Sequence, residues 1–152
     1  MSVVNTASQV LTKRNAPIMQ ALNARPASVR VAVYLMVAII VIFMAFSGYR
    51  YLVGAMPLVQ LNANLLVLSM TLLLPWRVWL ACNYSRIIYL VLTLTAIGQS
   101  LAPLLSGIFP DDFSLHFFML LTIPMQLASV WSLHSATTDA WFKTVKNARG
   151  AA

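Results

Sequence analysis

The sequence predicts an all-α integral membrane protein: a bundle of four transmembrane helices with both termini in the cytoplasm. Three observations lead to this prediction. Only 9% of the 152 residues are charged and 61% are apolar, whereas about a quarter of a soluble domain is charged. The charges fall in tails and turns, and they leave long uncharged runs between them. Basic residues are concentrated in alternate connecting segments, as they are in proteins that cross a bilayer.

The first 30 residues predict a basic cytoplasmic arm (1–30) ahead of a transmembrane domain over 31–138. A cleaved signal peptide would place its apolar region closer to the start and would end it at a site of small residues. We therefore expect the arm to be retained. It contains four basic residues and no acidic residue: Lys13, Arg14, Arg25 and Arg30.

Two uncharged runs in the first half of the chain predict the first two spans. Residues 31–49 are 19 uncharged residues, which as a helix reach roughly 28 Å, close to the hydrocarbon thickness of about 30 Å. Residues 57–74 predict the second span, because Pro57 can occupy the first turn of a helix and Pro75 is expected to end it.

Two further runs predict the third and fourth spans, over 87–106 and 115–135. Pro124 lies inside the fourth span, where we expect a kink that neighbouring helices can accommodate. Residues 139–152 follow as a basic cytoplasmic C-terminal tail. The transmembrane domain is therefore expected to be two helical hairpins joined by an inner turn.

The basic residues predict how the chain is oriented. With the N-terminus inside, nine basic residues fall in inner segments and only Arg50 falls in an outer segment. Since Lys and Arg are retained on the cytoplasmic side, both termini are predicted to be cytoplasmic. The turn between the second and third spans is an inner segment, and four of its side chains are expected to anchor it at the interface: Trp76, Arg77, Trp79 and Arg86.

The chain offers few groups for catalysis or metal binding. It contains three aspartates, no glutamate, two histidines and one cysteine, and no predicted span carries a set of them at ligand spacing. We therefore expect no enzymatic activity, no cofactor and no metal centre. Asp111 and Asp112, close to His116, could hold a divalent cation or could cap the N-terminus of a helix.

Cys82 and the positive charge add two limits. One cysteine allows no disulfide framework. Beside a membrane it is expected to be an ordinary small side chain, with palmitoylation as the alternative. The basic residues are not interleaved with aromatics on a soluble face, so nucleic acid is not an expected partner.

Polar amides and small residues fall within the predicted spans. Gln99 and Gln126 lie near the middle of adjacent antiparallel spans and are expected at similar depth. We expect the amides to hydrogen-bond between helices, and lining a substrate path is the alternative. The full set of amides is Asn62, Asn64, Gln99 and Gln126.

Gly98, Ala102 and Ser106 recur at four-residue spacing on the third predicted span. Small residues at this spacing let two helix backbones approach closely. We expect them to form an internal seam of the bundle, with a dimer interface as the alternative.

The segment from Asn83 to Leu90, NYSRIIYL, resembles a turn of small bacterial four-helix membrane proteins of uncharacterised function. Those proteins tend to place a Gly or Asn, an aromatic residue, a small residue and then Arg before their third helix. They also tend to end in a Trp-Phe pair after the fourth helix, as Trp141 and Phe142 do here. The resemblance implies a four-helix architecture in the bacterial inner membrane and implies no activity.

A short multi-span chain without catalytic groups favours a protein that acts by contact with another membrane protein. One form is an immunity-type protein that blocks a membrane-acting toxin, and another is an accessory subunit of a membrane complex. A second copy of the chain, in a homo-oligomer, is a further candidate partner. The competing function is a small transporter or channel lined by the four amides.

Overall fold

The computed structural model describes residues 16–105 and 113–150. Within these ranges 89% of the residues are helical and no strand is formed, so the all-α prediction is confirmed. A helical segment over 16–23 comes first. It is followed by α2 (Ala27–Leu52), α3 (Leu58–Thr71), α4 (Leu73–Trp79), α5 (Asn83–Leu105), α6 (Phe113–Leu133) and α7 (Ala136–Gly150).

Three helical stretches within the described ranges are long and apolar enough to cross a membrane. They are α2, the α3–α4 unit from Leu58 to Trp79, and α6 from Leu115 to Leu133, with 26, 22 and 19 residues. At 1.5 Å per residue, their lengths are about 39, 33 and 28 Å. The predicted third span falls on α5, which has 23 residues but is not among the three. The last residue of that predicted span, Ser106, lies outside the described residues.

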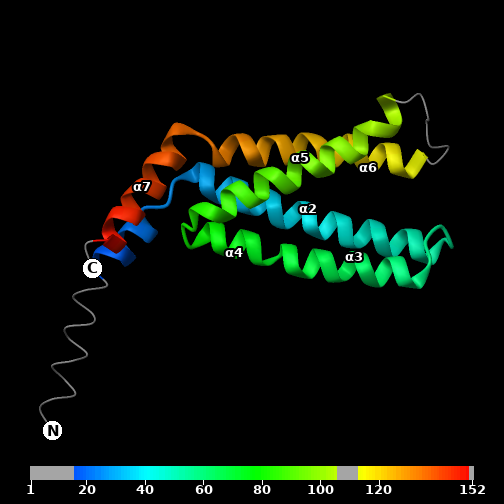
Figure 1. Cartoon of the computed structure of the whole chain (residues 1–152), viewed down its shortest axis with the longest axis horizontal. Helices are drawn as coiled ribbons and strands as arrows, with labels where there is room; N and C mark the ends of the chain where they lie inside the picture. Colours follow the sequence, from blue (N-terminus) through cyan, green and yellow to red (C-terminus); the bar gives the residue numbers. More distant parts are fainter. Residues whose placement is uncertain (1–15, 106–112, 151–152) are drawn as a thin grey trace, which may run out of the picture.

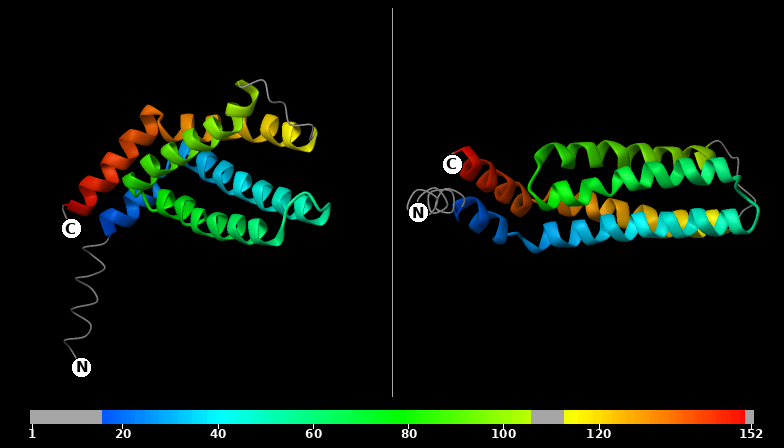
Figure 2. Two further views of the ribbon diagram at one scale, coloured as in Figure 1. Left: turned by 45° about the vertical axis from the view of Figure 1, so that its right-hand side comes forward. Right: turned by 90° about the horizontal axis from the view of Figure 1, so that it is seen from below.

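The helices lie in two layers. In the right-hand view of Figure 2, α2 and α6 form one layer, and α3, α4 and α5 form the other. The α2 helix packs on α6 and on α3–α4, whereas α5 packs on α4 and α6. Along its length α5 diverges from α3 (Figure 1). The described helices are therefore not a closed bundle, because α3 and α5 separate on one side.

The second predicted helix does not end at Pro75. Its hydrogen-bond ladder is interrupted at Leu72, between α3 and α4, and the chain then continues as a helix to Trp79. Proline lacks an amide hydrogen, and its ring clashes with the carbonyl four residues earlier, here that of Thr71. Pro75 is also the third residue of α4, where the amide would have no partner within the helix. Pro75 therefore divides the helix without ending it.

A tight turn at residues 80–82 connects α4 to α5. The amide of Cys82 donates to the carbonyl of Arg77 at 2.9 Å, and the amide of Ala81 donates to Val78 at 2.9 Å. This pair of bonds defines a Schellman motif, in which the residue after the cap is left-handed. Ala81 takes that position with φ 56°, and Gly54 takes the corresponding position after α2 with φ 72°.

The region that the sequence predicts as a C-terminal tail, 139–152, contains most of a packed helix, α7. Ser135 lies between α6 and α7 and accepts a hydrogen bond from the amide of Thr138 at 3.4 Å, as an N-cap does. The hydroxyl of Thr138 donates back to the carbonyl of Ser132 in the last turn of α6 at 2.9 Å. These bonds set the bend at which α7 leaves the line of α6 (Figure 1).

The largest cluster of buried side chains lies at one end of the molecule, which we call the junction. Here the 16–26 segment and the start of α2 meet the 80–82 turn, the start of α5, the end of α6, and α7. By contrast, α3, which is part of a candidate membrane span away from the junction, buries none of its residues. The cluster comprises Ala21, Val29, Ala32, Val33, Met36, Val78, Ala81, Tyr89, Leu133, Trp141, Phe142 and Val145.

Candidate functional site

Two arginines hold the end of α4 at the junction. Arg25 donates to the carbonyl of Trp79 at 3.0 Å, and its guanidinium carbon lies 3.6 Å from the centre of the Trp79 ring. Arg149 of α7 donates to the carbonyls of Leu80 and Ala81. The last carbonyls of a helix carry partial negative charge, so cations stabilise them. Burial, with a smaller effect of nearby Arg30, lowers the pKa of Arg25 below its usual value.

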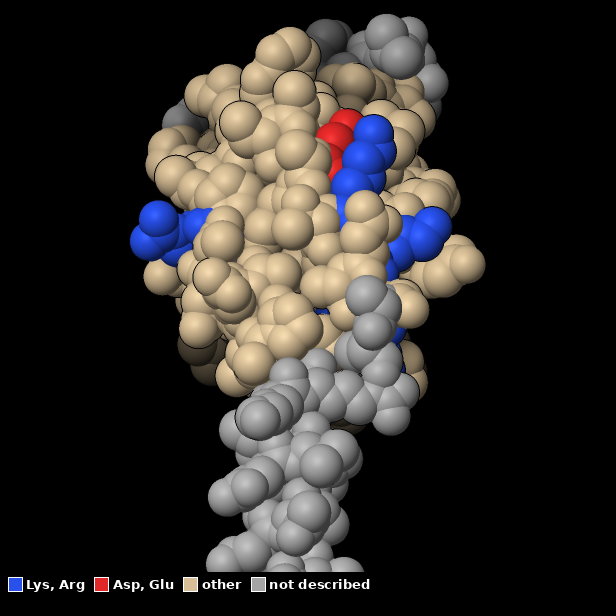
Figure 3. Space-filling view, turned by 90° about the vertical axis from the view of Figure 1, so that its left-hand side faces the viewer, with Lys and Arg blue, Asp and Glu red and all other residues tan. Residues whose placement is uncertain are grey.

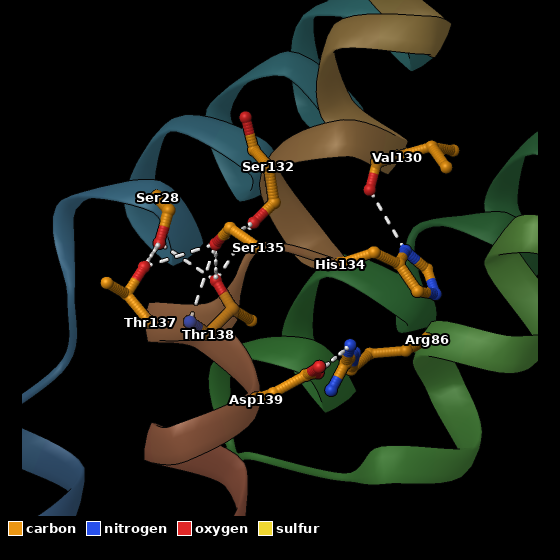
Figure 4. A network of polar contacts seen from close by, with 9 residues as sticks. All are labelled: Ser28, Arg86, Val130, Ser132, His134, Ser135, Thr137, Thr138 and Asp139. Carbon is orange, nitrogen blue, oxygen red and sulfur yellow. Dashed lines mark hydrogen bonds and ion pairs between the residues drawn. The ribbon is translucent and has the colours of Figure 1, made fainter.

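An ion pair between α5 and α7 lies at the same junction (Figure 4). Arg86 donates to a carboxylate oxygen of Asp139 at 2.5 Å, and its guanidinium lies 4.6 Å from the centre of the Phe142 ring. The Arg86 side chain is only 8% exposed, whereas that of Asp139 is 48% exposed. Arg86 is therefore a buried cation that joins α5 to α7. Its role as an anchor at the cytoplasmic interface stays a prediction.

A cluster of hydroxyl groups joins α2 to the bend between α6 and α7 (Figure 4). The hydroxyl of Ser28 lies 2.8 Å from that of Thr138 and 3.3 Å from that of Thr137. Nearby, the indole nitrogen of Trp141 donates to the carbonyl of Ala21 at 2.8 Å. The N-terminal segment, α2, α6 and α7 are thus fastened to one another by polar contacts.

The four predicted anchors occupy different environments. Trp76 is 61% exposed, and Arg77 is also exposed. Trp79 is half-buried beneath Arg25, and Arg86 is buried. Only the first two have the exposure that an interfacial anchor needs. The other two hold helices together.

A cavity of about 280 Å³, which we call the groove, lies between α2, α3, α5 and α6. Most of its lining is apolar, but Gln99 and Gln126 both face it. Gln126 is only 6% exposed, and its carbonyl oxygen Oε1 has no hydrogen-bond partner among the described residues. An unpaired buried polar atom is costly, and the described residues leave the hydrogen-bonding capacity of this oxygen unused.

The structure distributes the four predicted membrane amides unequally. Asn64 of α3 donates to the hydroxyl of Ser47 in α2 at 3.5 Å, which is the interhelical role expected of it. Asn62 is exposed on the same helix. Gln99, which is exposed, and the buried Gln126 line the same groove. The two glutamines were predicted to lie at similar depth on adjacent helices, and both line one cavity. Among the described residues, Oε1 of Gln126 has no hydrogen-bond partner.

The internal seam expected at Gly98, Ala102 and Ser106 does not form around the residues that the structure describes. Gly98 and Ala102 are exposed, and a Cβ atom added at Gly98 would meet nothing within 4 Å. In this part of the molecule α5 diverges from α3 (Figure 1). Ser106 lies outside the described residues.

Cys82 is a partly exposed free thiol at the start of α5. Hydrogen bonding from the Ser85 hydroxyl lowers the pKa of this thiol, and bonds from the backbone of Ser85 and Tyr84 and the charge of Arg77 act in the same direction. Burial opposes them by a smaller amount. A thiolate is therefore stabilised at this helix N-terminus.

The acidic pair Asp111 and Asp112 was predicted to cap a helix or to hold a cation. Asp111 and Asp112 lie outside the described residues. Among the residues that are described, no three His, Cys, Asp or Glu side chains come together as metal ligands would.

Sequence reasoning missed Asp139 as the partner of Arg86, because 53 positions separate the two residues. One signal was present: Asp139 is the only acid in the predicted inner segments, among nine basic residues. Comparison of the chain with protein-family models, curated proteins and solved structures gives no match in any of the three.

Proposed function

We propose that the chain is a small non-enzymatic protein of the bacterial inner membrane that acts by binding a helix of another membrane protein in the groove. The observation that carries this proposal is Oε1 of Gln126, which has no hydrogen-bond partner in the described part of the chain. An immunity-type protein that blocks a membrane-acting toxin would act in this way, and so would an accessory subunit of a membrane complex.

Lipid alone is a poor occupant of the groove. Acyl chains have no hydrogen-bond donor, and an unsatisfied polar group in hydrocarbon costs several kcal/mol. A helix that carries a Ser, Thr, Asn or Gln side chain at the right depth would supply the donor. Pairing with such a helix would stabilise the complex and select for the partner.

The size of the groove limits how the partner binds. A cavity of about 280 Å³ has room for side chains but not for a whole helix, which is about 10 Å wide. The partner helix would lie across the outside of α3 and α5 and insert side chains between them. The exposed apolar surface of α3, which buries none of its residues, supports this arrangement.

We further propose four spans with both termini in the cytoplasm. The described basic residues support this orientation, since seven of them lie on the junction side and Arg50 lies at the opposite end of α2. Reporter fusions after Arg25 and Ala152 should both report cytoplasm, and a fusion at Asp112 should report the outside. A periplasmic signal from the Ala152 fusion would mean that one span is absent.

A small transporter is the second candidate, and the same glutamine favours it. Gln126 lies two residues after Pro124 inside α6, which continues as one helix past the proline. A polar side chain at this depth can also line a substrate path. In this case a solute or water, and not a partner helix, would pair with Oε1. The two functions differ in whether the groove contacts another protein.

In-membrane photocrosslinking separates these functions. A benzoylphenylalanine probe replaces Val67 or Leu92, which line the groove, or Leu120, which is 75% exposed on α6 and does not line it. We expect both groove positions to give the same discrete protein adduct. The Leu120 control should give only lipid adducts.

The Gln126→Leu change is the second arm of this experiment. Because Leu offers no acceptor to the partner, the adduct at both groove positions should be lost. Lipid adducts alone from Val67 and Leu92 would rule out the partner-binding function. A protein adduct of twice the 16.8 kDa chain mass would identify the partner as a second copy.

A further inference from the structure

A second cavity, which we call the cleft, lies at the junction and is separate from the groove. It has a volume of about 740 Å³. The first turn of α5 and the turn at residues 81–82 form one wall, and α7 forms the other. Figure 3 shows this end of the molecule, with basic side chains distributed around it.

The charge of the cleft is strongly positive. Its lining includes four basic side chains, Arg86, Lys143, Lys146 and Arg149, against one acid, Asp139. Arg86 neutralises that acid through their ion pair. Arg149 is occupied with the carbonyls after α4. The two lysines, both exposed on α7, therefore leave uncompensated positive charge at the mouth of the cleft.

The N-terminus of α5 adds to this positive field. Asn83 and Tyr84, in its first turn, line the cleft, and the first turn contains no acidic residue. The first amide groups of a helix carry partial positive charge and bind phosphate oxygens well. In α5 the amides of Tyr84 and Ser85 already bond to Cys82, so the amide of Asn83 is the one offered to a ligand.

Arg86 supplies an independent sign of a missing ligand. Its side chain is more than nine-tenths buried and lines the cleft. One terminal nitrogen is paired with Asp139, but the Nε atom is buried without any hydrogen-bond partner among the described residues. A buried guanidinium N–H needs an acceptor, and a phosphate oxygen is a suitable one.

The cleft also has an apolar side that continues along α5. Tyr84 is 78% exposed and Ile87 is 52% exposed, and both line the cleft. One turn further along α5, Ile88 and Val91 are also exposed. A cationic pocket that opens onto an apolar helix face matches a lipid, which has a charged head and apolar chains, better than it matches a free anion.

We infer that the cleft binds the phosphate of an anionic phospholipid, whose acyl chains lie along the outer face of α5. Lys143, Lys146, the Nε atom of Arg86 and the amide of Asn83 at the start of α5 donate to the phosphate oxygens. The lipid would bridge α5 and α7 at the cytoplasmic interface. This site does not depend on the groove or on its partner.

Lipid retention by the purified full chain tests the site. The chain is reconstituted in nanodiscs of phosphatidylcholine with one-tenth phosphatidylglycerol, extracted into mild detergent, and examined by native mass spectrometry for bound phosphatidylglycerol. We expect the double variant Lys143→Gln with Lys146→Gln to lower the affinity about 25-fold, a factor of about five for each basic side chain near a membrane surface.

The matched control is Arg30→Gln with Arg77→Gln. It removes the same two charges from exposed positions on the junction side that do not line the cleft. The control should retain phosphatidylglycerol to within about twofold of the unchanged chain. Equal losses in the two variants would show diffuse surface attraction and overturn the site.

Inorganic phosphate distinguishes a lipid site from a free-anion site. At millimolar concentration it should not displace phosphatidylglycerol, because it lacks the acyl chains that contact α5. Displacement by phosphate alone would overturn the lipid assignment. Failure of the unchanged chain to retain phosphatidylglycerol in preference to phosphatidylcholine would overturn it as well.

Discussion

The junction and the groove are held together in different ways. At the junction, arginines, hydroxyls and an indole join segments that are distant in the sequence, around a cluster of buried side chains. At the groove, α3 buries none of its residues and α5 diverges from it. One region is fastened by polar contacts, and the other is apolar, open and contains an unpaired amide oxygen.

This difference follows from the solvent around each region. In hydrocarbon, burying apolar side chains against another helix brings little gain, because lipid tails are equally apolar. Close packing and polar contacts must then hold helices together. The junction, at the predicted interface, has both kinds of contact. The groove has few close-packed or polar contacts between its helices. A surface proposed to exchange lipid for a partner helix is expected to have few such contacts.

The largest expected effect is at the ion pair of the junction. Arg86→Glu would place two carboxylates side by side and should lower the free energy of unfolding by roughly 2 to 3 kcal/mol, less than a fully buried pair because Asp139 is half-exposed. The charge-swapped variant Arg86→Glu with Asp139→Arg should recover more than half of the loss. Denaturant unfolding in detergent measures both, and a swap no better than the single change would contradict the pair.

A smaller effect is expected at Trp141. Trp141→Phe leaves the carbonyl of Ala21 without its donor and should cost about 2 kcal/mol. The matched control is Trp76→Phe, at a residue that is 61% exposed, and it should cost less than about 0.5 kcal/mol. Similar losses in thermal unfolding would show that the contact between the N-terminal segment and α7 is not stabilising.

The two Schellman turns give the smallest expected effect. Gly54→Ala introduces a Cβ at a left-handed residue and should cost about 1 kcal/mol. Ala81→Gly relieves similar strain, but it removes a buried methyl group and adds freedom to the unfolded chain. Its net effect on the unfolding free energy should lie within about 0.5 kcal/mol of zero. A large gain from Ala81→Gly would mean that the strain is greater than its φ of 56° implies.

Much of the fold could be predicted because it depends on local pattern. Uncharged runs of helical length predicted the positions of α2, α3–α4 and α6. The distribution of basic residues predicted that the N-terminal segment, the turn between α4 and α5 and the C-terminal segment lie at the same end of the molecule. The second helix extends beyond Pro75 because this proline lies in the first turn of α4, where its missing amide costs no hydrogen bond within the helix. Ala81 could not be recognised as a left-handed turn residue, since Gly is the usual signal there.

The candidate sites were harder to predict because they depend on contacts between distant segments. That Gln99 and Gln126 line the same groove is consistent with the similar depth predicted for them in adjacent spans. The divergence of α5 from α3 is set by how whole helices pack, and no local pattern encodes it. The pair of Arg86 and Asp139 likewise required α7, which the sequence indicated only as a tail.

Disulfide trapping in native membranes tests most directly whether the groove is open. In a Cys82→Ser background, Val67→Cys with Leu92→Cys places thiols on α3 and α5 across the groove. The positive control is Ser47→Cys with Asn64→Cys. In the unchanged chain Nδ2 of Asn64 on α3 lies 3.5 Å from Oγ of Ser47 on α2. After mild oxidation, we expect the control pair to form a disulfide rapidly and the groove pair to remain reduced, since a disulfide requires Cα atoms within about 7 Å. A disulfide that forms across the groove as fast as in the control would mean that α3 and α5 close on each other in the membrane, leaving no groove for a partner.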